Sequence, residues 1–400
     1  MKKIIISGWY GYKNTGDEAI LASMVDSIRK EISDVVIIVF STDPTYTAKI
    51  HHVKAVYQLP FGVLSTGSTI LRGRLFQTVK ALWKTDLFIL GGGGFLSDWQ
   101  SWTVILQWLS QAVLAKIFRK KVMLYAVGTG PITTKRGKFL TRVILNRCAE
   151  VITVRDDQSK EWLQKAGVKK KIYVTADPAI LLKAVGTDRI NKMLKEEHID
   201  SSKPLVGIAI APIFHIQEYW PNQYKKFLKF KEVWPKVIDF ITSKLDANVV
   251  LIPMQNPIDR DFAFGLMNNI KNRDRVKILN SNYTPQEMMG IIGRMDMVVG
   301  MRFHSLVLAA KMGVPMVGVI YLHKSNCFLK QIEMERFAVH IGDGILWENK
   351  DINPSELIGN IKEVWSKKET LKKEIMDKVK KLKKRALTNN GFVLALLEDK

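Results

Sequence analysis

The sequence has few cysteines and no long apolar run. Only two cysteines, Cys148 and Cys327, occur in 400 residues, which argues against a disulfide framework and fits a reducing compartment. No stretch of 18 apolar residues is present, so we expect no transmembrane helix. The apolar run near Met1 is too short for a signal peptide and leads directly into a strand. We therefore expect a cytoplasmic protein.

Acidic residues are also scarce. The chain has 38 Asp and Glu against 61 Lys and Arg, a formal net charge of +23. Such an excess implies anionic partners, which are nucleic acid, a membrane surface or a phosphorylated substrate. The sequence has no helix-turn-helix, zinc-finger spacing or RNA-binding aromatic pattern, so we expect no nucleic acid. It also has no Cys/His spacing or acidic cluster typical of a metal site, and we expect neither a metal nor a bound cofactor.

Strands, glycine turns and helices alternate along the chain, which is the doubly wound α/β pattern. A length of 400 residues favours two domains over one. A polar, Lys- and Glu-rich stretch at 185–203 separates two runs of this pattern. We predict Rossmann-like domains at 1–190 and 201–365, with a cleft between them as in the GT-B architecture. A basic helix at 366–400 follows.

Two segments combine apolar residues with positive charge. The segment 369–385 carries eight Lys or Arg against three acids, and Leu371, Ile375, Val379 and Leu382 form a stripe at helical spacing. We expect this helix to pack back on the N-terminal domain, and the alternative is a helix on a membrane surface. The second segment, 59–84, joins an apolar loop to a basic stretch.

The first loop contains Gly8, Gly11 and Gly16 but matches neither the dinucleotide fingerprint nor a P-loop. Glycines before a helix still allow close approach of an anion to the backbone. Asp17 and Glu18 follow, and either could be the base that takes a proton from a sugar hydroxyl. Glu18 has a second explanation, a capping box in which Thr15 is the N-cap.

Arg302 and His304 occupy a predicted turn between a buried strand and an Ala-rich helix. Open α/β sheets bind ligands at this carboxyl end of their strands. Arginine offers a fork of donors to carboxylate or phosphate, and histidine can move a proton near neutral pH. The alternative is structural: Arg302 pairs with a core acid and His304 caps the helix.

Other candidates also follow predicted strands or lie among aromatic residues. Arg155 and Lys324 would add positive charge to the cleft. Asp98, beside two tryptophans, would suit a sugar ring, although tryptophans often serve packing alone. The remaining candidates for substrate binding are Gly91, Gly92, Gly93, Gly94, His215 and Gln255.

The chain resembles the bacterial polysaccharide pyruvyltransferase family, of the type that acts in cell-wall and S-layer anchoring. The similarity runs in family order over about residues 4–330. Family members often have Tyr-Asp-x-Lys where this chain has Tyr321-Leu322-His323-Lys324, so the lysine is kept and the acid is absent. The matching stretches are 8–21, Gly91–Gly94, 128–132, 154–156, 176–179, 252–255, 300–304 and 321–324.

The resemblance implies a GT-B-like fold and phosphoenolpyruvate as the donor of a 4,6-linked pyruvate ketal. The acceptor would be a sugar such as N-acetylmannosamine on a lipid-linked saccharide, with the acceptor on the side of the domain 1–190 and the donor on the side of the domain 201–365. This implies a peripheral protein at the anionic inner face of the membrane, and homo-oligomerisation stays open. In our hypothesis Arg302, Arg155 and Lys324 bind the donor, His304 donates the proton, and Asp17 or Glu18 is the base.

Two other functions remain open from the sequence. A GT-B glycosyltransferase that uses a nucleotide sugar would need a carboxylate for the ribose hydroxyls, and Glu287 is the candidate. A non-catalytic protein that binds membranes or polyanions would also suit the charge.

Overall fold

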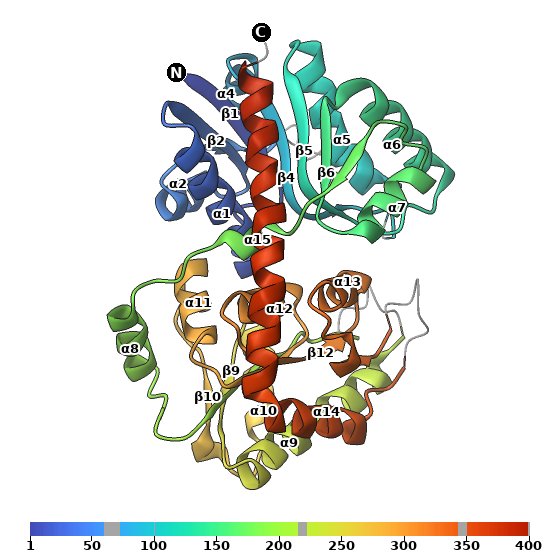
Figure 1. Cartoon of the computed structure of the whole chain (residues 1–400). Coiled ribbons are helices and arrows are strands. Elements are labelled where there is room, and N and C mark those ends of the chain that lie inside the picture. Colours follow the sequence, from blue (N-terminus) through green and yellow to red (C-terminus); the bar gives the residue numbers. More distant parts are fainter. Residues whose placement is uncertain (60–72, 100, 215–221, 343–349, 399–400) are drawn as a thin grey trace. The chain divides into compact units, whose positions relative to one another are not determined.

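The computed structural model describes residues 1–59, 73–99, 101–214, 222–342 and 350–398. The candidate His215 lies outside these ranges. The chain forms two compact units, of which the first is Met1–Leu182 with Leu382–Lys400 and the second is Lys183–Lys381 (Figure 1).

The first unit is built on a seven-stranded sheet in the order β3-β2-β1-β4-β5-β6-β7, in which neighbouring strands are parallel. The order reverses between β1 and β4, which is the switch point where such sheets bind ligands. The strands are β1 (Lys2–Ser7), β2 (Val35–Ser41), β3 (Lys54–Tyr57), β4 (Leu87–Leu96), β5 (Lys121–Thr129), β6 (Val151–Val154) and β7 (Ile172–Val174).

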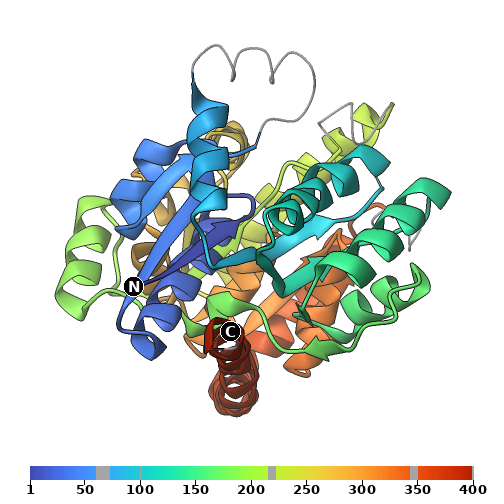
Figure 2. The same ribbon diagram turned by 90° about the horizontal axis from the view of Figure 1, so that it is seen from above.

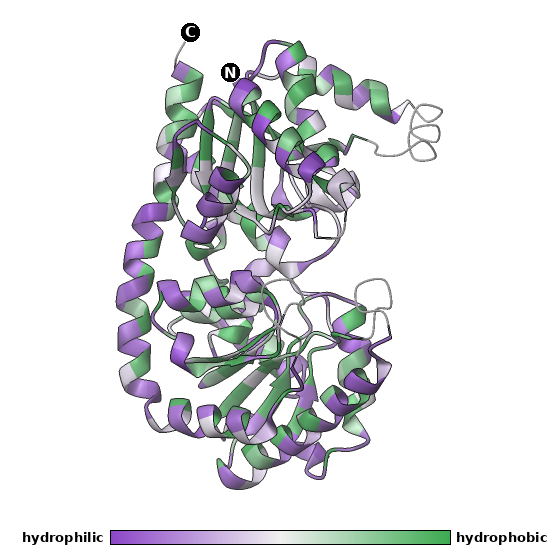
Figure 3. Cartoon of the chain, turned by 90° about the vertical axis from the view of Figure 1, so that its right-hand side faces the viewer, coloured by the Kyte–Doolittle hydropathy of each residue, from purple (hydrophilic) through white to green (hydrophobic). Residues whose placement is uncertain are grey.

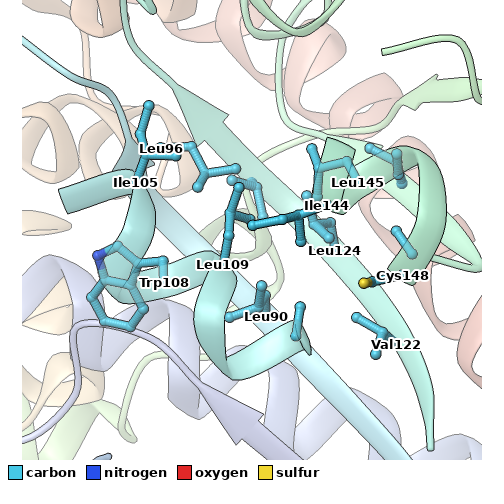
Figure 4. Close-up of a cluster of buried hydrophobic side chains, with 14 of the residues drawn as sticks. Leu90, Leu96, Ile105, Trp108, Leu109, Val122, Leu124, Ile144, Leu145 and Cys148 are labelled. Atoms are coloured by element: carbon cyan, nitrogen blue, oxygen red, sulfur yellow. The ribbon is translucent and has the colours of Figure 1, made fainter. Parts of the chain in front are cut away.

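Helices cover both faces of this sheet (Figure 2). One face carries α4 (Arg74–Trp83), α5 (Trp102–Ile117), α6 (Lys135–Cys148) and α7 (Asp157–Lys165), because their inward side chains share one hydrophobic core with the strands. Figure 4 shows the centre of that core, where Trp108 and Leu109 of α5 lie near Leu90 and Leu124. The unit also contains α1 (Thr15–Glu31), α2 (Pro44–His51) and the short 3-10 helix η1 (Pro178–Leu181).

The second unit repeats the plan with a six-stranded sheet in the order β10-β9-β8-β11-β12-β13, again with parallel neighbours. Its switch point lies between β8 and β11. The strands are β8 (Leu205–Ala209), β9 (Asn248–Leu251), β10 (Val276–Ile278), β11 (Met297–Gly300), β12 (Met316–Ile320) and β13 (Ala338–His340). The helices are α8 (Thr187–Glu196), α9 (Tyr224–Lys244), α10 (Ile258–Met267), η2 (Arg273–Arg275), α11 (Pro285–Ile292), α12 (Phe303–Lys311), α13 (His323–Gln331), η3 (Glu335–Phe337) and α14 (Pro354–Ser366).

In Figure 3 the strands of both sheets are largely coloured as hydrophobic, and hydrophobic and hydrophilic residues alternate along the helices. All five residues of β8 and of β12 are buried. Strands covered by helices on both faces read as continuous apolar runs, which is why these strands were recognisable in the sequence.

The boundary between the units lies earlier than the sequence indicates. The N-terminal part of the first unit ends at Leu182, not at 190, and the polar stretch at 185–203 belongs to the second unit. Helix α8 lies against α11 there: Val185 donates its backbone N–H to Gln286, and the Arg189 guanidinium pairs with Glu287.

The basic helix α15 (Lys368–Glu398) is shared between the units, whereas the sequence favoured packing on the first alone. Its residues up to Lys381 belong to the second unit and those from Leu382 onward to the first. The stripe Leu371, Ile375, Val379 and Leu382 is at most 3% exposed. Because this apolar stripe is covered by protein, the alternative of a membrane-surface helix is wrong for α15.

Two buried asparagines join α15 to the first unit. Asn389 accepts a hydrogen bond from the Thr153 hydroxyl at 2.6 Å, and Asn390 accepts one from the Tyr125 hydroxyl at 2.8 Å. Asn389 is fully buried and Asn390 is 3% exposed. Buried polar groups need such partners, so these bonds fix the register of the helix on the sheet.

In the described part of the chain, no helix is both long and apolar enough to cross a bilayer. Both cysteines are free thiols, with Cys148 buried and Cys327 partly exposed.

Candidate functional site

Arg302 and His304 lie where the sequence placed them. Strand β11 ends at Gly300, and α12 begins at Phe303 with Arg302 as its N-cap residue. Gly300 pairs with Ala209 of β8, so the turn stands at the switch point of the second sheet. The Arg302 side chain does not cap the helix, and backbone N–H groups at a helix N-terminus attract anions.

The Arg302 guanidinium forms a two-pronged pair with Asp259 in α10. Nε and Nη2 donate to the two carboxylate oxygens, at 3.1 Å and 2.5 Å. Asp259 is almost fully buried, and its Oδ2 also accepts the backbone N–H groups of Met254 and Gln255, at 3.1 Å and 3.0 Å. The structural alternative of a core acid is therefore confirmed for Arg302, yet its side chain stays 21% exposed. It is a cation held rigidly at the edge of the sheet.

Tyr321, the residue after β12, joins this pair. Burial alone would lower the pKa of Arg302, but Tyr321 and Asp259 outweigh it and hold the pKa above its ordinary value. Burial raises the pKa of the Tyr321 phenol, although the neighbouring Arg302 acts in the opposite direction. Arg302 is thus permanently charged, and Tyr321 keeps its proton at neutral pH.

The next strand brings Lys324 to the same place. Strands β11 and β12 are neighbours, and α13 begins at His323 just beyond β12. The Lys324 ammonium lies 5.6 Å from the centroid of the Phe303 ring, and that ring meets the His304 imidazole edge-on at 4.8 Å. Arg302, His304 and Lys324 therefore gather around Phe303. His304 is 9% exposed.

In the first unit, Asp17 and Glu18 have different surroundings although they are adjacent. Glu18 is 1% exposed, and both of its oxygens are engaged: one accepts the Gly11 N–H at 2.9 Å, and the other lies 2.6 Å from His51 Nε2. Asp17 is only half-buried. Its carboxylate lies beside Gly93, where an added Cβ would come within 3.3 Å of Asp17 Oδ1.

The capping box predicted for this helix is wrong. Helix α1 begins at Thr15 itself, and the N-cap is Asn14, whose side chain accepts the N–H groups of Gly16 and Asp17. Glu18 turns away to Gly11 and His51, since His51 offers a buried partner that a local cap cannot match. Glu18 thereby fixes the glycine loop.

The glycines 91–94 lie within a strand, because β4 continues through them to Leu96. A Cβ on Gly92 would lie 2.0 Å from Ile20, and one on Gly91 would lie 2.6 Å from Met24. The first two glycines thus let α1 lie directly on the strand. Gly93 and Gly94 instead adjoin the polar side chains Asp17 and Arg155.

Arg155 follows β6 as predicted, but it is buried rather than exposed to substrate. Its guanidinium packs on Gly128, where a Cβ would lie 2.6 Å from Cζ. Nη1 donates to Asp177 at 3.0 Å, Nε lies 3.6 Å from Asp156, and the side chain is 3% exposed. This charge is compensated inside the unit, so we describe Arg155 as a residue that supports the strand ends.

Asp98 also has a structural role. It is 4% exposed, and its two oxygens accept the backbone N–H and hydroxyl groups of Thr133 and Thr134, at 2.6 to 3.2 Å. Four donors leave the carboxylate little capacity for a sugar. Gln255 is half-buried, and its backbone N–H donates to Asp259, the partner of Arg302.

Sequence reasoning missed several partners of these residues. Asp259 is one of them, and the only available signal was its position four residues after Gln255. No sequence signal pointed to His51 or Tyr10, since their roles depend on contacts with residues distant in sequence. Tyr10 donates its hydroxyl to the Gly91 carbonyl at 2.7 Å, and burial, aided by Asp17 and Glu18, raises its pKa.

Among the described residues, no group of three or more His, Cys, Asp or Glu side chains could hold a metal ion.

Comparison with solved structures shows the fold. Similar chains include a glycosyltransferase from Rickettsia africae (TM-score 0.63, 12% identity, 100% of this chain and 99% of that one). Others are the MnaA–UDP structure from S. aureus (0.62, 15%, 95% and 91%) and Anabaena Alr3699/HepE with UDP and glucose (0.60, 15%, 100% and 100%). This chain has two parallel, doubly wound sheets. Together with these neighbours, the sheets confirm the predicted GT-B-like α/β fold.

The amylovoran biosynthesis protein AmsJ of Erwinia amylovora is 23% identical to this chain, over 84% of the chain and 87% of AmsJ. The family model for polysaccharide pyruvyl transferase matches residues 14–323. This range includes Asp17, Arg155, Asp259, Arg302 and His304, and it stops at the first residue of α13. Because the match covers most of both units, the chain belongs to the polysaccharide pyruvyl transferase family.

Proposed function

We propose that this transferase moves the pyruvyl group of phosphoenolpyruvate to a sugar as a 4,6-ketal and releases phosphate. The acceptor in this proposal is a lipid-linked saccharide, such as one that carries N-acetylmannosamine. One observation carries the proposal: Arg302 is fixed by Asp259 at the N-terminus of α12, next to His304 and Lys324.

Phosphoenolpyruvate is small and carries a carboxylate and a phosphate, so its site needs several fixed donors. Arg302 supplies a planar donor group that Asp259 holds in one orientation. Helices α12 and α13 begin side by side at neighbouring strands, and neither N-cap side chain occupies its helix end. Their backbone N–H groups and Lys324 add to the positive potential.

The proposed reaction begins with protonation of the donor. His304 gives a proton to the methylene carbon, which becomes the methyl group and leaves C2 cationic. A sugar hydroxyl adds to C2 and loses its proton to a base. The bond between C2 and the phosphate oxygen breaks, the second hydroxyl adds at C2, and its proton leaves with the phosphate.

Asp17 is our candidate for the base, and Glu18 is not. A base needs a carboxylate oxygen that can accept a proton from a substrate, and both oxygens of Glu18 already have protein partners. Asp17 is half-buried at the start of α1, beside the glycine backbone at Gly93.

Asp17→Asn and Glu18→Gln should therefore differ. We expect Asp17→Asn to lower phosphate release by about a hundredfold, because an amide cannot accept the proton. Glu18→Gln should lower the free energy of unfolding by about 1–2 kcal/mol, since it weakens the hydrogen bonds to Gly11 and His51, and should keep most of the turnover. Steady-state phosphate release and thermal unfolding of both variants decide this, and loss of turnover in Glu18→Gln alone would reverse the assignment.

Donor binding can be tested separately. Phosphoenolpyruvate should raise the unfolding temperature, and UDP- and CMP-sugars should not, because only a bound ligand stabilises the folded state. Arg302→Lys should weaken phosphoenolpyruvate binding about tenfold, since lysine lacks the planar fork. Arg294→Lys, at an exposed arginine of the same unit, is the matched control. Equal binding by both variants would contradict the role of Arg302.

A nucleotide-sugar glycosyltransferase is the rival function, and only the likeness of fold favours it. Glu287, its candidate ribose ligand, is engaged elsewhere: Oε2 accepts the Thr284 N–H at 3.0 Å, and Oε1 pairs with Arg189. These contacts lower the pKa of Glu287, although burial opposes them. Stabilisation by a UDP-sugar together with no response to phosphoenolpyruvate would favour this rival.

A further inference from the structure

Three helices of the first unit carry basic side chains and no acidic ones. Helices α4, α5 and α6 contain no Asp or Glu. The whole stretch from Arg74 to Cys148 has twelve Lys or Arg and two acids, Asp86 and Asp98. Asp98 is buried among threonines, and Asp86 accepts the Lys3 N–H at the edge of the sheet. The charged side chains of these three helices are therefore all positive, and Glu150, just beyond α6, neutralises one of them by pairing with Lys116.

Large apolar side chains stand exposed on the same helices. Phe76 and Trp83 of α4 are 70% and 60% exposed, Ile117 at the end of α5 is 68% exposed, and Phe139 of α6 is 55% exposed. The inward residues of α4, α5 and α6 share one core, so their outward residues lie on the same side of the sheet. We call this surface the basic helical face, defined by Phe76, Lys80, Trp83, Ile117, Phe139 and Arg142.

Helix α4 shows the pattern most clearly. Phe76 and Trp83 are seven residues apart, which places them two turns apart on one side, and Lys80 lies between them. The Lys80 ammonium is 5.9 Å from the Phe76 ring centroid. The inward side of the helix is occupied by Thr78 and Leu82, which are buried. The aromatic side has no core role and faces water.

We infer that the basic helical face binds the surface of an anionic bilayer, with Phe76 and Trp83 inserted among the lipid headgroups. Aromatic residues favour the interface between water and hydrocarbon, and cations beside them attract anionic lipids. Nucleic acid would also suit the charge, but an exposed aliphatic residue such as Ile117 gains nothing from a phosphate backbone. The inference deepens the lipid-linked acceptor of the proposed function and does not depend on the donor.

Vesicle flotation of the purified full chain tests this surface. The chain should bind vesicles that contain phosphatidylglycerol and should bind phosphatidylcholine vesicles at least about tenfold more weakly, with binding reduced by salt. Phe76→Ser/Trp83→Ser and Lys80→Glu/Lys84→Glu should each lower binding to the anionic vesicles by at least about tenfold.

Two matched controls test whether a loss of vesicle binding comes from this face or from a change in net charge or exposed aromatic surface anywhere on the chain. Lys373→Glu/Lys384→Glu changes the net charge by the same amount on exposed positions of α15. Tyr224→Ser/Phe264→Ser removes two exposed aromatics of the second unit, which are 55% and 50% exposed. Both controls should bind vesicles as the unchanged chain does. Equal losses in the controls, or unchanged binding in the α4 variants, would overturn the inference.

Two further measurements distinguish other outcomes. If a labelled DNA duplex bound and only the charge variants weakened it, while the unchanged chain failed to bind vesicles, the face would be a nucleic-acid surface. Phosphate release with a water-soluble glycoside should be unchanged in Phe76→Ser/Trp83→Ser. Absence of release in the unchanged chain would count against the proposed function only, because flotation decides the membrane surface by itself.

Discussion

Replacing His304 by glutamine should lower phosphate release from phosphoenolpyruvate by about a thousandfold. Glutamine keeps much of the size of the side chain and its ability to form hydrogen bonds, but it cannot donate a proton to carbon. His304 lies in the first turn of α12, against Phe303 and two residues after the fixed Arg302. Proton transfer to the methylene carbon should therefore be the step that fails, while donor binding remains.

Two measurements separate this chemical effect from misfolding. Stabilisation of His304→Gln by phosphoenolpyruvate should stay close to that of the unchanged chain. His340→Gln, at an exposed histidine at the end of β13, is the matched control and should keep full turnover. Phosphate release at the normal rate in His304→Gln would show that another group donates the proton.

The second large effect concerns stability. Arg155→Met should destabilise the first unit by about 3–5 kcal/mol, because it leaves Asp177 and Asp156 buried without their cation. Both carboxylates are at most 7% exposed. Amide hydrogen exchange in β5 and β6 measures this local free energy, and a loss of about 3–5 kcal/mol should make the protected amides exchange faster by about two to four orders of magnitude.

A double substitution tests the cause. Arg155→Met/Asp177→Asn should recover part of the loss, since asparagine removes the uncompensated charge and can still accept the Ala179 N–H. Arg147→Met, at an exposed arginine of α6, should change the free energy by less than about 0.5 kcal/mol. If Arg155→Met left exchange unchanged but abolished phosphate release, Arg155 would bind substrate directly, as the sequence first suggested.

Local patterns predicted the parts of the site that depend on local structure. Arg302 and His304 follow a short apolar strand and precede an Ala-rich helix, so the sequence alone placed them at the carboxyl edge of a sheet. The parallel order of the sheets likewise follows from alternating strands and helices. The identity of the acid beside Arg302 did not follow, because Asp259 reaches it from another element of the fold.

Burial separated residues that look alike in the sequence. Asp17 and Glu18 are adjacent carboxylates. Glu18 has a structural role only because it contacts His51, which lies in a helix that we did not predict. Arg155 resembles Arg302 as an arginine at a strand end, yet Gly128 and Asp177 enclose it. Such differences arise from contacts between distant segments, which spacing and composition do not encode.

The shared helix α15 has a consequence for the order of events during synthesis. The hydroxyls of Thr153 and Tyr125 obtain their partners Asn389 and Asn390 from beyond the second unit. A ribosome must therefore translate the entire second unit before the first can complete its interior. Until then the part of the sheet that receives α15 stays uncovered, so the first unit is incomplete for longer during synthesis than the second unit, which is contiguous in sequence.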